Sequence, residues 1–184
     1  FGEFHSDDYV LVILKNGQFY TTNFDLNNHY EPTGILRVEK FDEHKVWTAV
    51  LYDADQQGFP YVKRFTLERC VQTRPQSFIG DNANSRFVLL TDQVYPRVQV
   101  TYGGNDDFRD ALVVDVESFI GVKSYKAKGK RLTTCTVERI EELEPTRFLD
   151  PETETTTDAE ETTNSEEANN DDENSEPSLF DNVE

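Results

Sequence analysis

The chain has 184 residues and is strongly acidic, with 36 Asp and Glu against 18 Lys and Arg and a formal net charge of −18. No run of about 18 apolar residues occurs, which argues against a membrane-spanning helix, and no charged segment followed by an apolar one marks a signal peptide. We therefore expect a cytoplasmic protein, with a packed core supported by 13 Phe and 8 Tyr residues.

The first predicted elements are two strands joined by a tight turn. Between Asp8 and Phe24, a β-branched and aromatic run is broken by Asn16-Gly17, which favours a type I′ hairpin turn. Further β-prone segments, each bounded by turn residues, follow at 35–40, 46–52 and 61–67. None of them has a sustained 3.6-residue apolar period, so strands are predicted rather than helices.

The same pattern resumes after the polar linker 80–85. Strands are predicted at 86–91, 94–102, 110–115 and 121–125. The segment 136–144 is the best candidate for a helix because its apolar residues Val137, Ile140 and Leu143 recur every third position. A closing strand is the alternative for this segment.

The predicted strands divide into two weakly similar units, at about 7–79 and 85–149. The matching segments are Tyr9–Val12 with Phe87–Leu90, Thr48–Asp53 with Asp110–Asp115, and Val62–Phe65 with Val122–Tyr125. Two repeated units of about four short strands indicate a bladed all-β array. Since such units need neighbours, and since the chain begins at Phe1, we expect a fragment of a longer ring of blades.

The C-terminal segment 150–184 differs in composition from the rest of the chain. It contributes fourteen of the 36 acidic residues and no Lys or Arg, so that residues 1–149 carry 22 acids against 18 bases, about −4. Its low apolar content predicts a disordered tail. The tail could fold back on basic side chains and compete with a bound anion, or serve only to solubilise the chain.

The chain has no recognisable catalytic or metal-binding motif. There is no P-loop, no G-x-S-x-G and no GxGxxG, and the three histidines His5, His29 and His44 lack partners at ligand spacing. Cys70 and Cys135 are predicted to be buried free thiols. We expect no catalytic site and no cofactor in this chain.

Lys and Arg residues cluster at matching places in the two units, which predicts a basic rim that follows a phosphate backbone. The candidate phosphate contacts are Lys63, Arg64, Arg69, Arg74, Lys123, Lys126, Lys128, Lys130 and Arg131. Gly129 would let the loop approach an anion closely, and Lys126, Lys128 and Lys130 would point the same way if the loop is extended. Tyr125 would pack under the cations or contact a sugar.

These segments resemble a known family. The Val10-Leu-Val-x-x-x-x-Gly17 hairpin, Tyr61-Val-Lys-Arg-Phe65 and the basic string 119–132 are similar to the C-terminal domain of the A subunit of bacterial type IIA topoisomerases. The resemblance covers about residues 7–149, and topoisomerase IV of Bacteroidetes is the closer match. The loop 126–131 lacks the Gln and the paired glycines of the gyrase box that lets DNA wrap fully.

The resemblance implies a β-pinwheel of four-stranded blades whose basic outer rim binds and bends duplex DNA without sequence specificity. It implies a chromosome-associated role in DNA topology and chromosome segregation, with the topoisomerase catalytic core and B subunit as partners. The catalytic tyrosine and the parts that use ATP and Mg²⁺ belong to regions absent from this chain. Two other functions stay open: a protein-interaction propeller that binds an acidic partner, and an acidic DNA mimic or histone-like chaperone acting through the tail.

Overall fold

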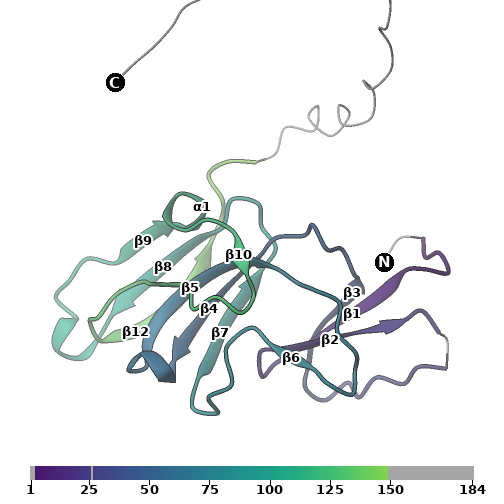
Figure 1. Ribbon diagram of the computed structural model, residues 1–184. Helices are drawn as coiled ribbons and strands as arrows, with labels where there is room; N and C mark the ends of the chain where they lie inside the picture. The colour runs from purple at the N-terminus through teal and green to yellow at the C-terminus, as the bar shows by residue number, and fades with distance from the viewer. Residues whose placement is uncertain (1–2, 26, 149–184) are drawn as a thin grey trace, which may run out of the picture. The chain divides into compact units, whose positions relative to one another are not determined.

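The computed structural model describes residues 3–25 and 27–148. These residues form three β-sheets joined by loops and very short helical turns, so the predicted all-β class is confirmed (Figure 1). The predicted disordered tail at 150–184 lies outside the described residues.

The three sheets take their strands in an order that differs from the chain order. The N-terminal sheet has the order β3 (Ile35–Lys40), β1 (Tyr9–Leu14), β2 (Gln18–Asn23) and β6 (Gln76–Ser77). The central sheet has the order β10 (Lys123–Ser124), β5 (Phe59–Thr66), β4 (Trp47–Asp53) and β7 (Arg86–Thr91), with β11 (Lys130–Arg131) also paired to β5. The C-terminal sheet has the order β12 (Val137–Leu143), β8 (Arg97–Tyr102) and β9 (Leu112–Asp115). The helical turns are η1 (Ala54–Gln56), η2 (Gly104–Asp106) and α1 (Val116–Phe119).

The predicted first hairpin is present, but its turn is not of type I′. That turn needs positive φ at both central residues. Gly17 has a φ of +79°, whereas Gln57 is the one non-glycine residue with positive φ in the described part of the chain. The Gly17 amide donates to the Leu14 carbonyl at 3.0 Å, which closes a turn ahead of the glycine. The Asn16 side chain accepts a hydrogen bond from the Gln18 amide at 3.0 Å, which holds Asn16 in this arrangement.

The segment 136–144 forms the closing strand rather than the helix. β12 pairs antiparallel with β8, and the register shifts between Val137 and Arg139. A bulge adds one residue to the strand, so that Val137 and Ile140 reach the same side although three positions separate them. Both side chains pack in the same hydrophobic cluster. The three-residue spacing of apolar residues therefore reflects a bulged strand.

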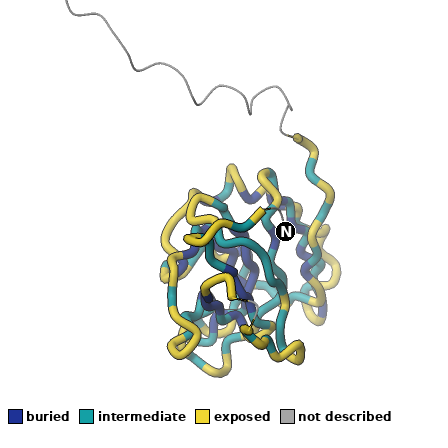
Figure 2. The backbone as a smooth tube through the Cα atoms, turned by 90° about the vertical axis from the view of Figure 1, so that its right-hand side faces the viewer, coloured by how far each residue is buried: buried dark blue, intermediate teal, exposed yellow. Residues whose placement is uncertain are grey.

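The central sheet packs on both of its faces. On β4, Ala49 joins a cluster with Leu11 and Phe19 of the N-terminal sheet, whereas Val50 joins a cluster with Val98 of the C-terminal sheet. Neighbouring residues of a strand point to opposite faces, so this alternation is what a sheet buried on both sides requires. In Figure 2 the buried stretches of the tube lie inside and the exposed loops outside.

The sheets do not follow the division into units at 7–79 and 85–149. The central sheet takes β4 and β5 from the first unit and β7, β10 and β11 from the second. Val62–Phe65 and Val122–Tyr125, which match in sequence, are direct neighbours in this sheet, because Lys123 pairs with Phe65. The arrangement of these sheets as blades of a pinwheel stays a prediction.

Candidate nucleic-acid interface

The basic segment 123–131, called the basic loop below, closes on the edge of β5 at both of its ends. Lys123 in β10 pairs with Phe65 in the parallel direction, and Arg131 in β11 pairs with Tyr61 in the antiparallel direction. Figure 1 shows β10 beside β5 at this edge. Two backbone attachments to one strand fix where the loop begins and ends.

The middle of the basic loop is turned rather than extended. The amide of Ala127 donates to the carbonyl of Ser124 at 2.9 Å, which closes a turn. The expected alternation of Lys126, Lys128 and Lys130 along an extended strand is therefore absent, because alternation requires extended backbone.

Lys63, a predicted phosphate contact, lies inside the protein. Its side chain is only 5% exposed, and its ammonium donates to the carbonyls of Phe78 at 2.6 Å and Tyr125 at 2.5 Å. Burial lowers the pKa of Lys63 to about 8 because the charged form loses hydration. The prediction for Lys63 is therefore corrected: its ammonium is buried away from an external phosphate, and its bonds to two carbonyls make it an anchor of the basic loop.

Gly129 brings the basic loop close to β5 rather than to an anion. Its φ is +87°, and a Cβ at this position would lie 2.6 Å from the carbonyl oxygen of Val62 and 2.6 Å from Cγ of Lys63. Glycine alone adopts this backbone conformation readily and leaves this space empty. The close approach seen in the structure is to the protein's own strand, and the predicted approach to an anion stays a prediction.

The five cations of the basic loop are exposed and have no acidic partner in the described part of the chain. Lys123, Lys126, Lys128, Lys130 and Arg131 are all classed as exposed. Within residues 3–25 and 27–148, none of the five lies within 4.0 Å of a carboxylate oxygen. Their charge is thus available to an external anion.

Three of these cations rest against aromatic rings. The pairs are Lys126 with Tyr125, Lys130 with Phe119 and Arg131 with Phe59, at 5.3, 3.9 and 5.3 Å from charge to ring centroid. Such contacts restrict where a long side chain places its charge. Tyr125 is itself 3% exposed and packs edge-on against Phe19, so it supports the cations from below and cannot reach a sugar.

The other predicted contacts are dispersed. Arg64 is half-buried, and its Nη2 lies 3.5 Å from the Val94 carbonyl. Its Nε is buried with no hydrogen-bond partner among the described residues, and burial lowers the pKa of Arg64. Arg69 and Arg74 are exposed in the segment between β5 and β6. The structure therefore does not gather all nine predicted residues on one site.

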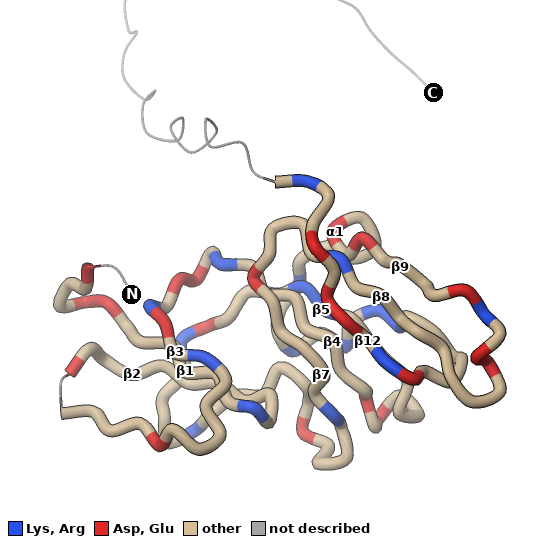
Figure 3. Tube along the Cα trace, turned by 180° about the vertical axis from the view of Figure 1, so that it is seen from behind, with Lys and Arg blue, Asp and Glu red and all other residues tan. Residues whose placement is uncertain are grey.

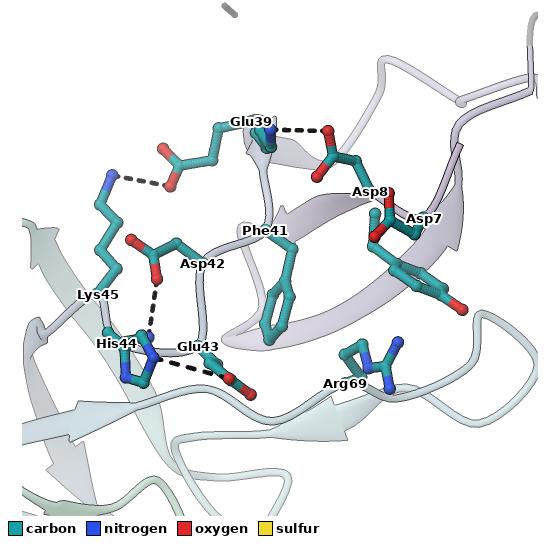
Figure 4. Close-up of a pocket in the computed structure, with 11 residues that line it drawn as sticks. Asp7, Asp8, Glu39, Phe41, Asp42, Glu43, His44, Lys45 and Arg69 are labelled. Carbon is teal, nitrogen blue, oxygen red and sulfur yellow. Dashed lines mark hydrogen bonds and ion pairs between the residues drawn. The ribbon is translucent and has the colours of Figure 1, made fainter. Parts of the chain in front are cut away.

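Arg69 lines an open pocket of about 750 Å³ whose other charged residues are mostly acidic (Figure 4). Its guanidinium lies 4.6 Å from the centroid of the Tyr9 ring. The acidic residues of the pocket are Asp7, Asp8, Glu39, Asp42 and Glu43. This negative surrounding opposes phosphate binding at Arg69.

A second basic region, residues 37–45, is neutralised by carboxylates. Arg37 makes two hydrogen bonds to Asp92, at 3.0 and 2.6 Å, and a third to Glu39 at 2.7 Å. Lys45 lies 2.8 Å from Glu39 and 2.7 Å from Asp92. Partial burial of Asp92 raises the pKa of its carboxyl, but the bonds to Arg37 and Lys45 outweigh this effect and lower the pKa to about 2. Figure 3 shows this mixture of signs around β3.

Two exposed cations outside the predicted set, Lys15 and Arg86, also have no carboxylate partner in the described part of the chain. Each stands alone in sequence, one in the first hairpin turn and one at the start of β7. Runs of Lys and Arg in the sequence do not reveal these two residues, because neither has a basic neighbour in the chain.

A groove of about 360 Å³ separates the basic loop from the segment 77–81. Lys126 and Lys128 stand on one side, while Asp53, Asp55 and Asp81 also line it. Asp55 already accepts a hydrogen bond from the Asn82 side chain at 2.6 Å. The loop lysines therefore share this groove with three carboxylates, one of which is already hydrogen-bonded.

The chain was compared with known proteins. The family model described as "Topoisomerase C-terminal domain, Bacteroidota" matches residues 1–144. No curated protein and no solved structure was found to match. Among the described residues, no helix has the length and apolar character that crossing a membrane requires. Because the family model covers most of the chain, this protein belongs to the Bacteroidota family of topoisomerase C-terminal domains.

Proposed function

We propose that this domain binds and bends duplex DNA, without sequence specificity, as part of the A subunit of a topoisomerase IV. The observation that carries the proposal is the basic loop: five exposed cations with no acidic partner among residues 3–25 and 27–148, on a loop fixed to β5 at both ends. Free cations held in fixed positions are what phosphate recognition requires.

The expected contacts are with the DNA backbone rather than with base edges. Reading bases in the major groove requires an inserted helix or a two-stranded ribbon with side chains that reach the base edges. The α-helix in the described part of the chain, α1, has only four residues. The loop cations are Lys and Arg on short strands and turns, so they suit phosphates at any sequence.

In the parent enzyme the domain would present a bent DNA segment to the catalytic core for ATP-dependent strand passage. The core and the B subunit would be its protein partners, and ATP and Mg²⁺ would act in those parts. This role places the domain on the bacterial chromosome, in the cytoplasm, during chromosome segregation. Family membership supports the association with a topoisomerase, and the unpaired cations support DNA as the ligand.

A salt titration of DNA binding tests the proposal. The variant Lys123→Gln/Lys126→Gln/Lys128→Gln removes three exposed charges of the basic loop that have no described carboxylate partner. Its control, Arg109→Gln/Arg139→Gln/Arg147→Gln, removes three exposed charges that are paired with Asp106, Glu141 and Glu117. Both variants change the net charge equally, so they separate local contacts from the overall field.

The loop variant should bind a generic duplex more weakly, and its salt slope should be shallower by up to about 0.9 unit per lost contact, about 2.7 in all. The control should keep the wild-type slope. Equal slopes for the two variants would remove the basic loop from the interface. No retardation of duplex DNA by the wild type at low salt would instead favour the second candidate, a domain that binds an acidic protein.

A further inference from the structure

A second polar groove, called the hairpin groove below, lies between the first hairpin turn and the start of β7. It has a volume of about 530 Å³. Its charged side chains are Lys15, Arg86 and Asp81, and most of its remaining lining is polar, including Asn16, Gln18, Ser77, Asn82 and Ser85. Two cations against one carboxylate give its walls a positive balance.

The walls of the hairpin groove are held by backbone contacts. The Phe78 amide donates to the Gly17 carbonyl at 3.0 Å, and Gln18 pairs with Ser77 across β2 and β6. A Cβ on Gly17 would lie within 2.9 Å of three atoms of Ile79, so the turn packs directly on this segment. The hairpin turn of the N-terminal sheet is thus fastened to the chain that leads into β7, and the groove is preformed.

The two cations of the hairpin groove are free to meet an anion. Both Lys15 and Arg86 are exposed, and neither lies within 4.0 Å of a carboxylate among residues 3–25 and 27–148. The Arg86 guanidinium lies 4.3 Å from the centroid of the Tyr52 ring. That contact fixes the guanidinium at the end of the central sheet without using its hydrogen-bond donors.

The hairpin groove continues to the basic loop. Ser77, Ile79, Gly80 and Asp81 line both this groove and the 360 Å³ groove that carries Lys126 and Lys128. The segment 77–81 is therefore a shared wall, and the cations on either side of it have no carboxylate partner among the residues that the structure describes.

The distance from β7 to β11 across the central sheet is comparable with a few base pairs of duplex DNA. Arg86 on β7 pairs with Tyr52, Tyr52 pairs with Pro60, and Pro60 accepts a hydrogen bond from the amide of Leu132, which follows β11. Three strand spacings of about 4.8 Å separate Arg86 from β11, roughly 14 Å in all. This corresponds to the axial rise of about four base pairs of duplex DNA, at 3.4 Å each.

We infer that Lys15 and Arg86 form a further phosphate-binding site, which extends the DNA path from the basic loop across the segment 77–81 to the N-terminal sheet. The inference rests on the proposed function, since the ligand is the backbone of the same duplex. The path then includes two sheets, so the hairpin groove adds length to the bound DNA. Asp81, on the shared wall, opposes phosphate binding on both sides.

The test uses the chain 1–184 and a generic duplex. Lys15→Gln/Arg86→Gln removes the two cations, and Arg109→Gln/Arg139→Gln removes two exposed, paired cations as a charge-matched control. The first variant should bind about tenfold more weakly at low salt, with a slope shallower by up to about 1.8 units. It should also protect a shorter stretch of DNA from hydroxyl radicals. Asp81→Asn should bind more tightly than the wild type.

The outcomes separate this inference from the proposed function. Absence of duplex binding by the wild type overturns both. A second outcome is that the wild type binds DNA and the basic-loop variant loses affinity, while Lys15→Gln/Arg86→Gln has the same salt slope and DNA footprint as its control. This outcome overturns the phosphate site in the hairpin groove and leaves the proposed function standing. A shallower salt slope together with a shorter DNA footprint for Lys15→Gln/Arg86→Gln supports the phosphate site in the hairpin groove.

Discussion

Two basic regions of this domain differ in whether carboxylates pair with their cations. Arg37 and Lys45 lie within 3.0 Å of Glu39 and Asp92, which link β3 to the loop after β7. In the basic loop at 123–131, exposed cations lie on aromatic rings and no described carboxylate reaches them. The first region holds the fold together, and the second is available to a ligand.

This difference shows that a count of Lys and Arg does not identify a binding surface. The field of a charged side chain is largely cancelled when the side chain pairs with an opposite charge in the same protein. An unpaired charge can still attract an external partner. Lys63 is a third case. It belongs to a cationic run in sequence, yet it is 5% exposed and bonded to two carbonyls. Three environments thus give the same charge three different roles.

The largest effect is expected from Gly129→Ala, which breaks the attachment of the basic loop. The new Cβ would meet the Val62 carbonyl and Lys63 at 2.6 Å each, at a φ of +87°. We expect a loss of about 3 kcal/mol in the free energy of unfolding, or local release of the loop, together with weaker DNA binding. Urea unfolding and DNA binding check this. Gly34→Ala is the control, since Gly34 also has positive φ but no atom within 4 Å of a Cβ.

The next largest effect is expected from Lys63→Met, which we compare with the same substitution at Lys126. The comparison distinguishes a lysine that anchors the basic loop from one that contacts DNA. Lys63→Met leaves the Phe78 and Tyr125 carbonyls without their donor, so we expect a loss of about 2 kcal/mol in stability. Lys126→Met, at an exposed site, should leave stability within about 0.5 kcal/mol and lower DNA affinity. Equal stability of the two variants would show that Lys63 does not anchor the loop.

The pH dependence of stability gives an independent check on Lys63. Its pKa is about 8 in the folded protein and 10.5 as a free side chain. Between these values the unfolded chain binds the proton and the folded protein does not, so Lys63 makes the free energy of unfolding rise with pH from about 8 to 10.5. Lys63→Met should flatten this rise, while Lys126→Met should retain it.

The smallest effect is expected on the ion-paired side of the comparison, from Asp92→Asn. The pKa of Asp92 is lowered to about 2, so its stabilising effect is present above pH 3.8 and is lost as pH falls toward 2. Because Asp92 is partly exposed, we expect a loss of only about 1 kcal/mol at neutral pH and a smaller loss at pH 2, where about half of the Asp92 carboxyls are protonated. Thermal unfolding at the two pH values measures this.

DNA binding by Asp92→Asn sharpens the comparison. Glu39 still pairs with both Arg37 and Lys45 in this variant, so their charge stays engaged and affinity should change little. An increase in affinity as large as the decrease caused by Lys126→Met would show that carboxylate pairing is not what distinguishes the two basic regions.

The sequence by itself determined the all-β class, the positions of most strands and the family. β1, with its run of β-branched and aromatic residues, and β7 at 86–91 lie where local pattern places them, since these signals depend on neighbouring residues alone. The type I′ turn and the helix at 136–144 were wrong. The turn geometry depended on Asn16 accepting a hydrogen bond from Gln18, and the apolar spacing of β12 depended on a bulge against β8.

Only the tertiary structure decided which cations are available. It buried Lys63, paired Arg37 and Lys45, left the basic loop exposed, and placed Lys15 and Arg86 beside a wall shared with that loop. Burial and ion pairing arise between residues far apart in the chain, such as Arg37 with Asp92 and Lys63 with Tyr125. A charge is visible in sequence, but its hydration and its partners exist only once the chain has folded.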